Sequence, residues 1–234
     1  MEIQRRVLQH SPTNYQYYIK PGKLAKRYQE GEFVGAGDEG AVSAFKKYTL
    51  GPESQWLEST KQRVIKRYHD FHSASERNET GILAQLRQAN PSRGEIHPNV
   101  MAGKVVEIQD HDTTSAVIMP RWPTTLTELN PESKPLSTRI NVASQVKNGL
   151  GFLHRNNIAH MDIKGPNVLY NSDTDKVKIC DFGQSKKIPW SDPEKVQLLL
   201  RADKERTITL FRSFFTPSEL TLPEVESVVR TWQE

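Results

Sequence analysis

The chain reads HMDIKGPN at residues 160–167 and DFG at residues 181–183. In this order the two stretches supply a carboxylate that can receive a hydroxyl proton, Asp162, and a lysine for a transferred phosphate, Lys164. They also supply Asn167 and Asp181, whose oxygen atoms suit magnesium. Packing alone gives no reason for polar groups at this spacing, so the two motifs together indicate phosphoryl transfer.

Two further motifs lie upstream: GAGDEGAV at residues 35–42 and VIK at residues 64–66. Glycines let backbone N–H groups approach phosphates without an intervening side chain. With these motifs, roughly residues 32–190 resemble the protein kinase superfamily. The compact second half is similar to serine/threonine kinases found among bacterial effectors and viruses that act on host proteins.

The resemblance implies that ATP and Mg²⁺ bind to the chain. At the tip of the glycine-rich turn, Asp38 and Glu39 are unusual neighbours for a polyphosphate, so we expect both to point outward. Pro120 needs to offer only its carbonyl to the adenine, which a proline can do. The nucleotide-binding residues implied by the resemblance are Gly35, Gly37, Gly40, Val42, Lys66, Met119, Pro120 and Trp122.

A glutamate on the following helix should pair with Lys66 and hold its ammonium against the α- and β-phosphates. Glu79 fits the family pattern, and Glu76, one helical turn earlier, is the alternative. The helix itself is predicted over residues 72–88, with Ser73 or Ser75 as N-cap. Its apolar residues at helical spacing are Ile82, Leu83 and Leu86.

The resemblance also implies roles for the residues around the two opening motifs. We expect His160 to brace the loop rather than to react. Asp203 is a candidate for a buried aspartate that supports this loop, and a solvated aspartate at a helix start is the alternative. The implied catalytic residues are Asp162, Lys164, Lys66 and Glu79, and the implied magnesium ligands are Asn167 and Asp181.

The predicted fold class is α+β, a bilobal kinase-like fold with a β-rich N-lobe and a truncated, mainly helical C-lobe. Only 51 residues follow Gly183, fewer than a full kinase C-lobe needs. Helices are expected at residues 137–155, beginning at a Ser/Thr cap, and at about 193–214 and 223–232. The predicted domains are an N-terminal arm or first strand (1–31), an N-lobe (32–119), a hinge (120–123) and a reduced C-lobe (124–234).

Composition is that of a soluble globular protein, with 26% charged and 35% apolar residues among 234. The net charge of +4 is small and basic residues alternate with acidic ones, so we expect no nucleic-acid partner. A single cysteine, Cys180, excludes an intramolecular disulfide. Without a signal peptide or a membrane-length apolar run, the expected location is cytoplasmic, with delivery into a host cell by another route left open.

One departure from the family concerns regulation. The arginine that usually precedes the catalytic aspartate is replaced by Met161, which cannot bind a phosphate on the activation loop. We therefore consider three functions: an active serine/threonine protein kinase acting on a folded, perhaps host, protein; a pseudokinase that binds a partner; and a small-molecule kinase. The first function is favoured because five polar residues that it needs are all present: Lys66, Asp162, Lys164, Asn167 and Asp181. The substrate, the oligomeric state and a partner that completes the second lobe stay open.

Overall fold

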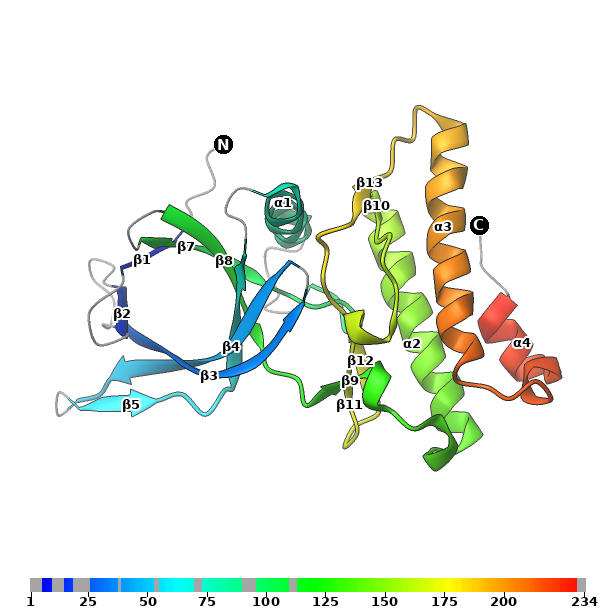
Figure 1. The fold of residues 1–234 in the computed structure, drawn as a ribbon, viewed down its shortest axis with the longest axis horizontal. Helices are drawn as coiled ribbons and strands as arrows, with labels where there is room; N and C mark the ends of the chain where they lie inside the picture. Colours follow the sequence, from blue (N-terminus) through cyan, green and yellow to red (C-terminus); the bar gives the residue numbers. More distant parts are fainter. Residues whose placement is uncertain are drawn as a thin grey trace. The chain divides into compact units, whose positions relative to one another are not determined.

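The computed structural model describes residues 6–9, 15–18, 26–37, 39–52, 55–69, 73–89, 96–109 and 113–230 (Figure 1). These residues form two compact units. The first unit comprises the described residues up to 88 together with 102–121, and the second comprises 89–101 together with the residues from 122 onward. Strands dominate the first unit and helices the second, which confirms the predicted α+β class with a β-rich and a mainly helical lobe.

The strands of the first unit join in one sheet that closes on itself. Its order is β3-β2-β1-β7-β8-β6-β4-β5, and β3 also pairs with β4, so the ring of strands in Figure 1 is a barrel. Neighbouring strands are antiparallel except β1 and β7, which are parallel. The strands are β1 (Arg6–Gln9), β2 (Tyr15–Tyr18), β3 (Lys26–Gly37), β4 (Gly40–Leu50), β5 (Trp56–Glu58), β6 (Arg63–Tyr68), β7 (Lys104–Gln109) and β8 (Thr113–Pro120).

The interior of this barrel holds one apolar cluster. The rings of Tyr28 and Phe45 stack there with centroids 5.3 Å apart. Because successive side chains of a strand point to opposite faces, Val64 and Lys66 lie on the outer face of β6 while Ile65 lies inside. The cluster consists of Tyr28, Phe45, Ile65, Val106, Ile108, Ala116 and Ile118.

One helix, α1 (Ala74–Ala89), belongs to this part of the chain. It begins where the sequence predicts, because the Glu76 N–H donates to the Ser73 Oγ at 3.1 Å. Gly103 packs closely beside it: a Cβ there would lie 2.8 Å from the Leu83 Cδ1. The predicted apolar face is buried and contains Ile82, Leu83 and Leu86.

The second unit contains the remaining elements. Among its described residues the longer helices are α2 (Leu136–Arg155), α3 (Pro193–Arg212) and α4 (Pro223–Arg230). The predicted Ser/Thr cap of α2 is wrong, because Pro135 is the N-cap and no side chain caps the helix. Short elements are β9 (Thr124–Thr125), β10 (Ile158–Ala159), β11 (Val168–Asn171), β12 (Lys176–Ile179), β13 (Lys186–Lys187), η1 (Leu126–Glu128), η2 (Pro131–Ser133), η3 (Gly165–Asn167) and η4 (Glu219–Thr221).

The segment before β7 packs with the second unit. The Met101 N–H donates to the Ile179 carbonyl at 2.8 Å, and the Ile179 N–H donates to the Asn99 carbonyl at 2.9 Å. The Asn99 side chain also donates to the Val177 carbonyl at 3.2 Å. Residues 96–101 therefore extend the β11–β12 hairpin, although the predicted N-lobe range of 32–119 includes them.

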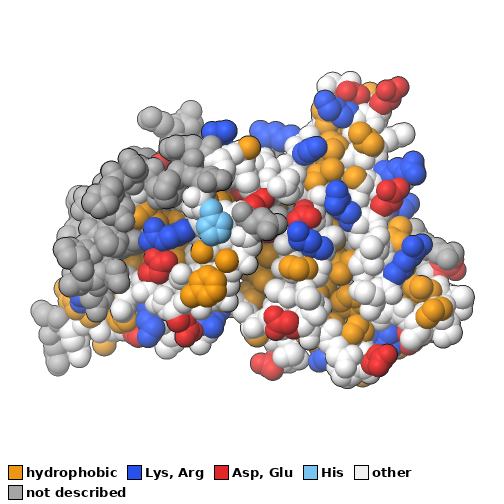
Figure 2. Space-filling view, viewed as in Figure 1, with side chains coloured by type: hydrophobic (Ala, Val, Ile, Leu, Met, Phe, Trp, Pro, Cys, Tyr) orange, Lys and Arg blue, Asp and Glu red, His pale blue; other side chains and the backbone are white. Residues whose placement is uncertain are grey.

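The surface shows mixed charge and no membrane segment. Over the second unit, Figure 2 shows basic and acidic side chains interleaved, without a continuous basic stripe among the described residues of that face. No helix in the described part of the chain has the length and apolar character needed to cross a bilayer.

Candidate active site

In the first unit, a buried ion pair joins β6 to α1. The Lys66 Nζ lies 2.7 Å from the Glu79 Oε2, and the exposed fractions of the two side chains are 9% and 3%. The Tyr68 hydroxyl donates to the same Glu79 oxygen at 2.8 Å. The structure thus brings Lys66 to Glu79 rather than to Glu76, and the second donor holds the carboxylate in place.

The predicted glycine-rich turn joins β3 to β4. Gly40 is required by packing, because a Cβ there would lie 2.1 Å from the Arg67 carbonyl oxygen. A Cβ on Gly35 or Gly37 would meet nothing within 4 Å. Open space beside both glycines fits a bound nucleotide, whose phosphates could approach the backbone there.

The tip of the turn differs from the expectation. Glu39 does not point outward, since its Oε2 lies 3.7 Å from the Lys66 Nζ and its side chain is 16% exposed. Asp38, its neighbour, lies outside the described residues. The prediction that Glu39 points outward is therefore wrong.

Strand register places the predicted nucleotide residues of β4, β6 and β8 on one face. Val42 lies opposite Lys66, which lies opposite Val117. The next row on this face consists of Ala44, Val64 and Met119. Sequence reasoning missed Ala44 and Val64, although their spacing of two residues from Val42 and Lys66 carries that signal. The resulting apolar rows flank the lysine, as an adenine ring would need.

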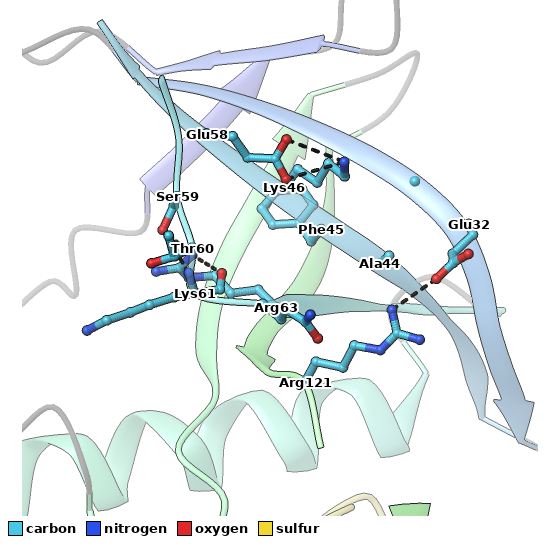
Figure 3. Close-up of a pocket in the computed structure, with 12 residues that line it drawn as sticks. Glu32, Ala44, Phe45, Lys46, Glu58, Ser59, Thr60, Lys61, Arg63 and Arg121 are labelled. Carbon is cyan, nitrogen blue, oxygen red and sulfur yellow. Dashed lines mark hydrogen bonds and ion pairs between the residues drawn. The ribbon is translucent and has the colours of Figure 1, made fainter. Parts of the chain in front are cut away.

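A hollow of about 640 Å³ adjoins this face at Ala44 (Figure 3). None of the predicted nucleotide-binding residues lines it. Its two carboxylates already have cationic partners: Glu58 lies 3.3 Å from the Lys46 Nζ, and Glu32 lies 3.0 Å from an Arg121 guanidinium nitrogen. In Figure 3 the Lys61 ammonium points away from the hollow. We therefore assign no phosphate site to it.

The hinge residues are divided between the units. Pro120 ends β8 opposite Arg63, and its side chain is exposed. The following N–H, of Arg121, donates to the Gln62 carbonyl at 3.2 Å. Trp122 belongs to the second unit, where the Lys178 Nζ lies 5.9 Å from its ring centroid. The adenine contacts implied for Pro120 and Trp122 stay predictions.

In the second unit, three polar side chains of the loop at residues 160–167 converge. The Lys164 Nζ lies 2.8 Å from the Asp162 Oδ2. The Asn167 Nδ2 donates to the same oxygen at 2.8 Å and to the Asp162 carbonyl at 2.9 Å. The turn η3 makes this convergence local, because it folds Asn167 back onto Asp162. The Asp162 Oδ1 accepts no hydrogen bond from the described residues.

A fully buried carboxylate on α3 holds this loop from within the unit. The Asp203 Oδ2 accepts from the His160 N–H at 2.8 Å, and its Oδ1 accepts from the Met161 N–H at 2.7 Å. The His154 Nε2 lies 2.8 Å from the Asp203 Oδ2. Of the two alternatives for Asp203, the buried support is the one that the structure shows.

His160 braces the loop, as expected. Burial lowers the pKa of its imidazole, and the ring is therefore neutral at pH 7. Its Nε2 donates to the Cys180 carbonyl at 3.0 Å, and its Nδ1 accepts from the Asp162 N–H at 3.3 Å. A ring with one donor and one acceptor satisfies both bonds without a charge.

Asp181 is connected to this network through Cys180, the residue before it in the chain. The Cys180 N–H donates to the Asn167 carbonyl at 2.9 Å, which links the residue before Asp181 to the loop at residues 160–167. Asp181 itself has φ of 66°, as does Met161. Left-handed backbone at two non-glycine residues is a local strain of the kind found at functional sites. The oxygens of Asn167 and Asp181 form a donor set that fits Mg²⁺.

Comparisons with known proteins agree with this geometry. Residues 28–201 match the family model described as "Protein kinase domain". Mitogen-activated protein kinase kinase kinase 6 of Homo sapiens is 51% identical over 49 residues, 21% of this chain and 4% of that protein. Protein kinase MCK1 of Saccharomyces cerevisiae is 27% identical over 180 residues, 73% of this chain and 43% of that protein. The matched stretch thus spans less than half the length of each relative.

Proposed function

We propose that the chain, which belongs to the protein kinase family, transfers the γ-phosphoryl group of ATP to serine and threonine hydroxyls of protein substrates. The observation that carries the proposal is the convergence of Lys164 and Asn167 on one oxygen of Asp162, each at 2.8 Å. This arrangement leaves the other oxygen of Asp162 for the acceptor hydroxyl, whose proton it would take.

The proposed ligands of the nucleotide and its metal ion are described unit by unit, beginning with the first unit. Backbone N–H groups near Gly35 and Gly37 would lie against the phosphates, and Lys66 would hold the α- and β-phosphates. Asn167, through its Oδ1, and Asp181 would hold Mg²⁺, which neutralises phosphate charge when bound. Lys164 would stabilise the negative charge that develops on the transferred group.

The acceptor side of the proposal rests on the second unit. A hollow of about 340 Å³ lies directly beside the catalytic loop, lined by Ile163, Lys164 and Gly165 and by Glu205, Arg206, Thr209 and Leu210 of α3. Only residues 184–191 separate Gly183 from Asp192, the N-cap of α3. Helix α3 then supplies one side of the hollow. Serine and threonine must bring their backbone close to Asp162, and this hollow offers a place for it.

The test is phosphorylation of a cell lysate with labelled ATP and Mg²⁺, followed by mapping of the phosphosites by mass spectrometry. Phosphoserine and phosphothreonine are expected with the wild-type protein and are absent with Asp162→Asn. Predominant phosphotyrosine would overturn the acceptor assignment. Absence of any turnover would support the pseudokinase alternative, and label confined to small molecules would support a small-molecule kinase.

A second comparison tests whether the substrate is a folded protein. The small second unit offers few subsites for a short peptide, so remote contacts should supply part of the positioning. The strongest phosphosite of the lysate is measured as a peptide and within its folded protein, and the folded protein should have the higher kcat/KM. Equal values would contradict this docking argument. Action on a host protein stays a prediction.

A further inference from the structure

The hollow beside the loop at residues 160–167 is lined by a cation that the proposed transfer does not use. Arg206 lines this hollow together with Lys164, and Arg206 is exposed. Within the described part of the chain, the Arg206 guanidinium takes part in no hydrogen bond or ion pair. It is therefore available to a group of the substrate that enters the hollow.

The other two charged side chains of the hollow already have ionic partners. The Lys164 Nζ lies 2.8 Å from the Asp162 Oδ2, beside which it is proposed to act on the transferred phosphate. The Glu205 Oε1 lies 2.7 Å from the Arg201 Nε, and Arg201 does not line the hollow. Of the charged residues that line the hollow, Arg206 is thus the one that lacks a counter-ion among the described residues.

Apolar and cationic groups meet in this hollow. Ile163 and Leu210 line it and are buried. Arg206 and Leu210 lie four residues apart on α3 and so share one face of the helix. Beside apolar side chains, water competes less for a charged group, which strengthens its attraction to an opposite charge. Because the planar guanidinium also matches the two oxygens of a carboxylate or a phosphate, the hollow suits an anionic side chain.

We propose that Arg206 binds an anionic side chain of the protein substrate, a few residues from the accepting serine or threonine. Carboxylates of Asp and Glu have this chemistry, and so does a phosphate already attached to the substrate. Arg206 thereby selects a hydroxyl by its neighbours and takes no part in the transfer itself. The inference rests on the proposed function, since it names the substrate class of the same site.

The test repeats the lysate experiment with wild type and Arg206→Gln, on lysate whose phosphates have been removed with a phosphatase that is then inactivated. Sites that also appear with Asp162→Asn come from other kinases and are subtracted. Asp and Glu should be enriched about threefold around the wild-type sites, relative to all serines and threonines of the lysate, as expected for one partly exposed ion pair. The enrichment should disappear with Arg206→Gln.

Lysate that keeps its phosphates distinguishes the two sources of the anion. If the partner of Arg206 is a carboxylate, the same sites flanked by Asp and Glu appear in both lysates. If the partner is a phosphate, phosphorylated neighbours are enriched in the untreated lysate, and treatment with phosphatase removes those sites. In either case the enrichment must depend on Arg206.

Charge reversal gives a second measurement. With Arg206→Glu, Lys and Arg should replace the acidic neighbours of the phosphosites. In the folded substrate of the strongest site, exchange of its acidic neighbour for lysine should lower kcat/KM about threefold with wild type and raise it by a similar factor with Arg206→Glu. A gain with the variant cannot result from damage to its fold, and thermal unfolding of each protein checks the fold directly.

The matched controls are Lys195→Gln and Lys195→Glu. Lys195 is an exposed cation of the same helix that does not line the hollow, so both variants should keep the wild-type preference. Absence of anionic enrichment with wild type in both lysates would overturn the role of Arg206, and so would equal enrichment with Arg206→Gln. Loss of the enrichment with the Lys195 variants would assign it to the charge of the whole helix and overturn the role as well. Absence of phosphorylation by wild type would instead contradict the proposed function.

Discussion

The ion pair of the first unit and the catalytic loop of the second unit hold their charged groups in different ways. Lys66 and Glu79 extend from a strand and a helix and meet directly, 2.7 Å apart. Asp162 stands in a loop whose backbone is bound by Asp203, a fully buried residue far along the chain. The first arrangement joins side chains of one strand and one helix, whereas the second also depends on an acceptor outside the loop.

The largest difference between the two sites is expected from a substitution of Asp162. Asp162→Asn should reduce phosphoryl transfer by about 10³-fold, because an amide cannot take the hydroxyl proton. The dissociation constant for Mg-ATP, measured by calorimetry, should stay nearly unchanged, since the side chain acts on the acceptor. The control is Asp173→Asn in the exposed β11–β12 turn. A variant that kept a tenth of the wild-type rate would exclude Asp162 as the base.

Loss of the buried acceptor should have the next largest effect. Asp203→Ala leaves the His160 and Met161 N–H groups without their acceptor, and should lower the free energy of unfolding by about 3 kcal/mol. Transfer should fall by about 10²-fold because the loop is no longer held in place. Chemical denaturation and steady-state kinetics measure the two effects.

Asp192→Ala, at the start of the same helix, gives the matched control for Asp203→Ala. It removes only the N-cap bond to the Lys195 N–H, worth about 1 kcal/mol, and should not change the rate. Equal kinetic effects of the two substitutions would show that the loop does not depend on Asp203 in particular.

On the first unit, Glu79→Gln should lower kcat/KM for ATP by roughly tenfold, because it removes the charge that positions Lys66. Glu76→Gln changes a buried glutamate of the same helix and should have a much smaller effect. Steady-state kinetics with varied ATP measures both. A larger loss of kcat/KM with Glu76→Gln than with Glu79→Gln would show that the assignment of the anchoring role to Glu79 is wrong.

Acid should affect the catalytic loop through His160. The unfolded chain takes up a proton near the ordinary imidazole pKa of 6.5, whereas burial lowers the pKa of folded His160. The folded state therefore loses stability as the pH falls below 6.5, by up to about 1.4 kcal/mol per pH unit. Unfolding between pH 8 and 5 should show a steeper decline for wild type than for His160→Asn. Parallel curves would contradict this linkage.

The smallest expected effect is that of loop phosphorylation. Met161 packs against an apolar cluster of Ala159, Ile188, Val196 and Leu199, so this position offers no cation to a phosphate. Protein treated with phosphatase and verified by mass spectrometry should keep its rate within about twofold. A large loss of activity, restored by rephosphorylation, would contradict the absence of this switch.

Sequence patterns over a few residues predicted the elements of the fold whose contacts lie close together in the chain. The strands around Lys66 and the apolar face of α1 follow from alternation and helical periodicity, and the distance between Glu76 and Glu79 is one helical turn. The loop residues Asp162, Lys164 and Asn167 also converge within one short turn. These features required no knowledge of distant segments.

Other features depend on contacts that sequence spacing does not record. Glu39 lies beside Lys66, and Gly40 packs on the backbone of β6, and the sequence of the turn reveals neither contact. The parallel pairing of β1 with β7 joins segments separated by most of the first unit. From the sequence, Asp203 fits a solvated aspartate as well as a buried one that supports the loop. Only the packing of α3 distinguishes the two interpretations.

The support of the loop by Asp203 has a consequence for synthesis on the ribosome. Asp203 follows Met161 by 42 residues, so the backbone N–H groups of the loop gain their acceptor only after α3 has emerged and docked. A nascent chain that already displays the whole first unit and the HMDIKGPN stretch would still lack an ordered loop. The onset of phosphoryl transfer would then coincide with the emergence of α3, near the end of this sequence, and the growing chain would stay inert until that point.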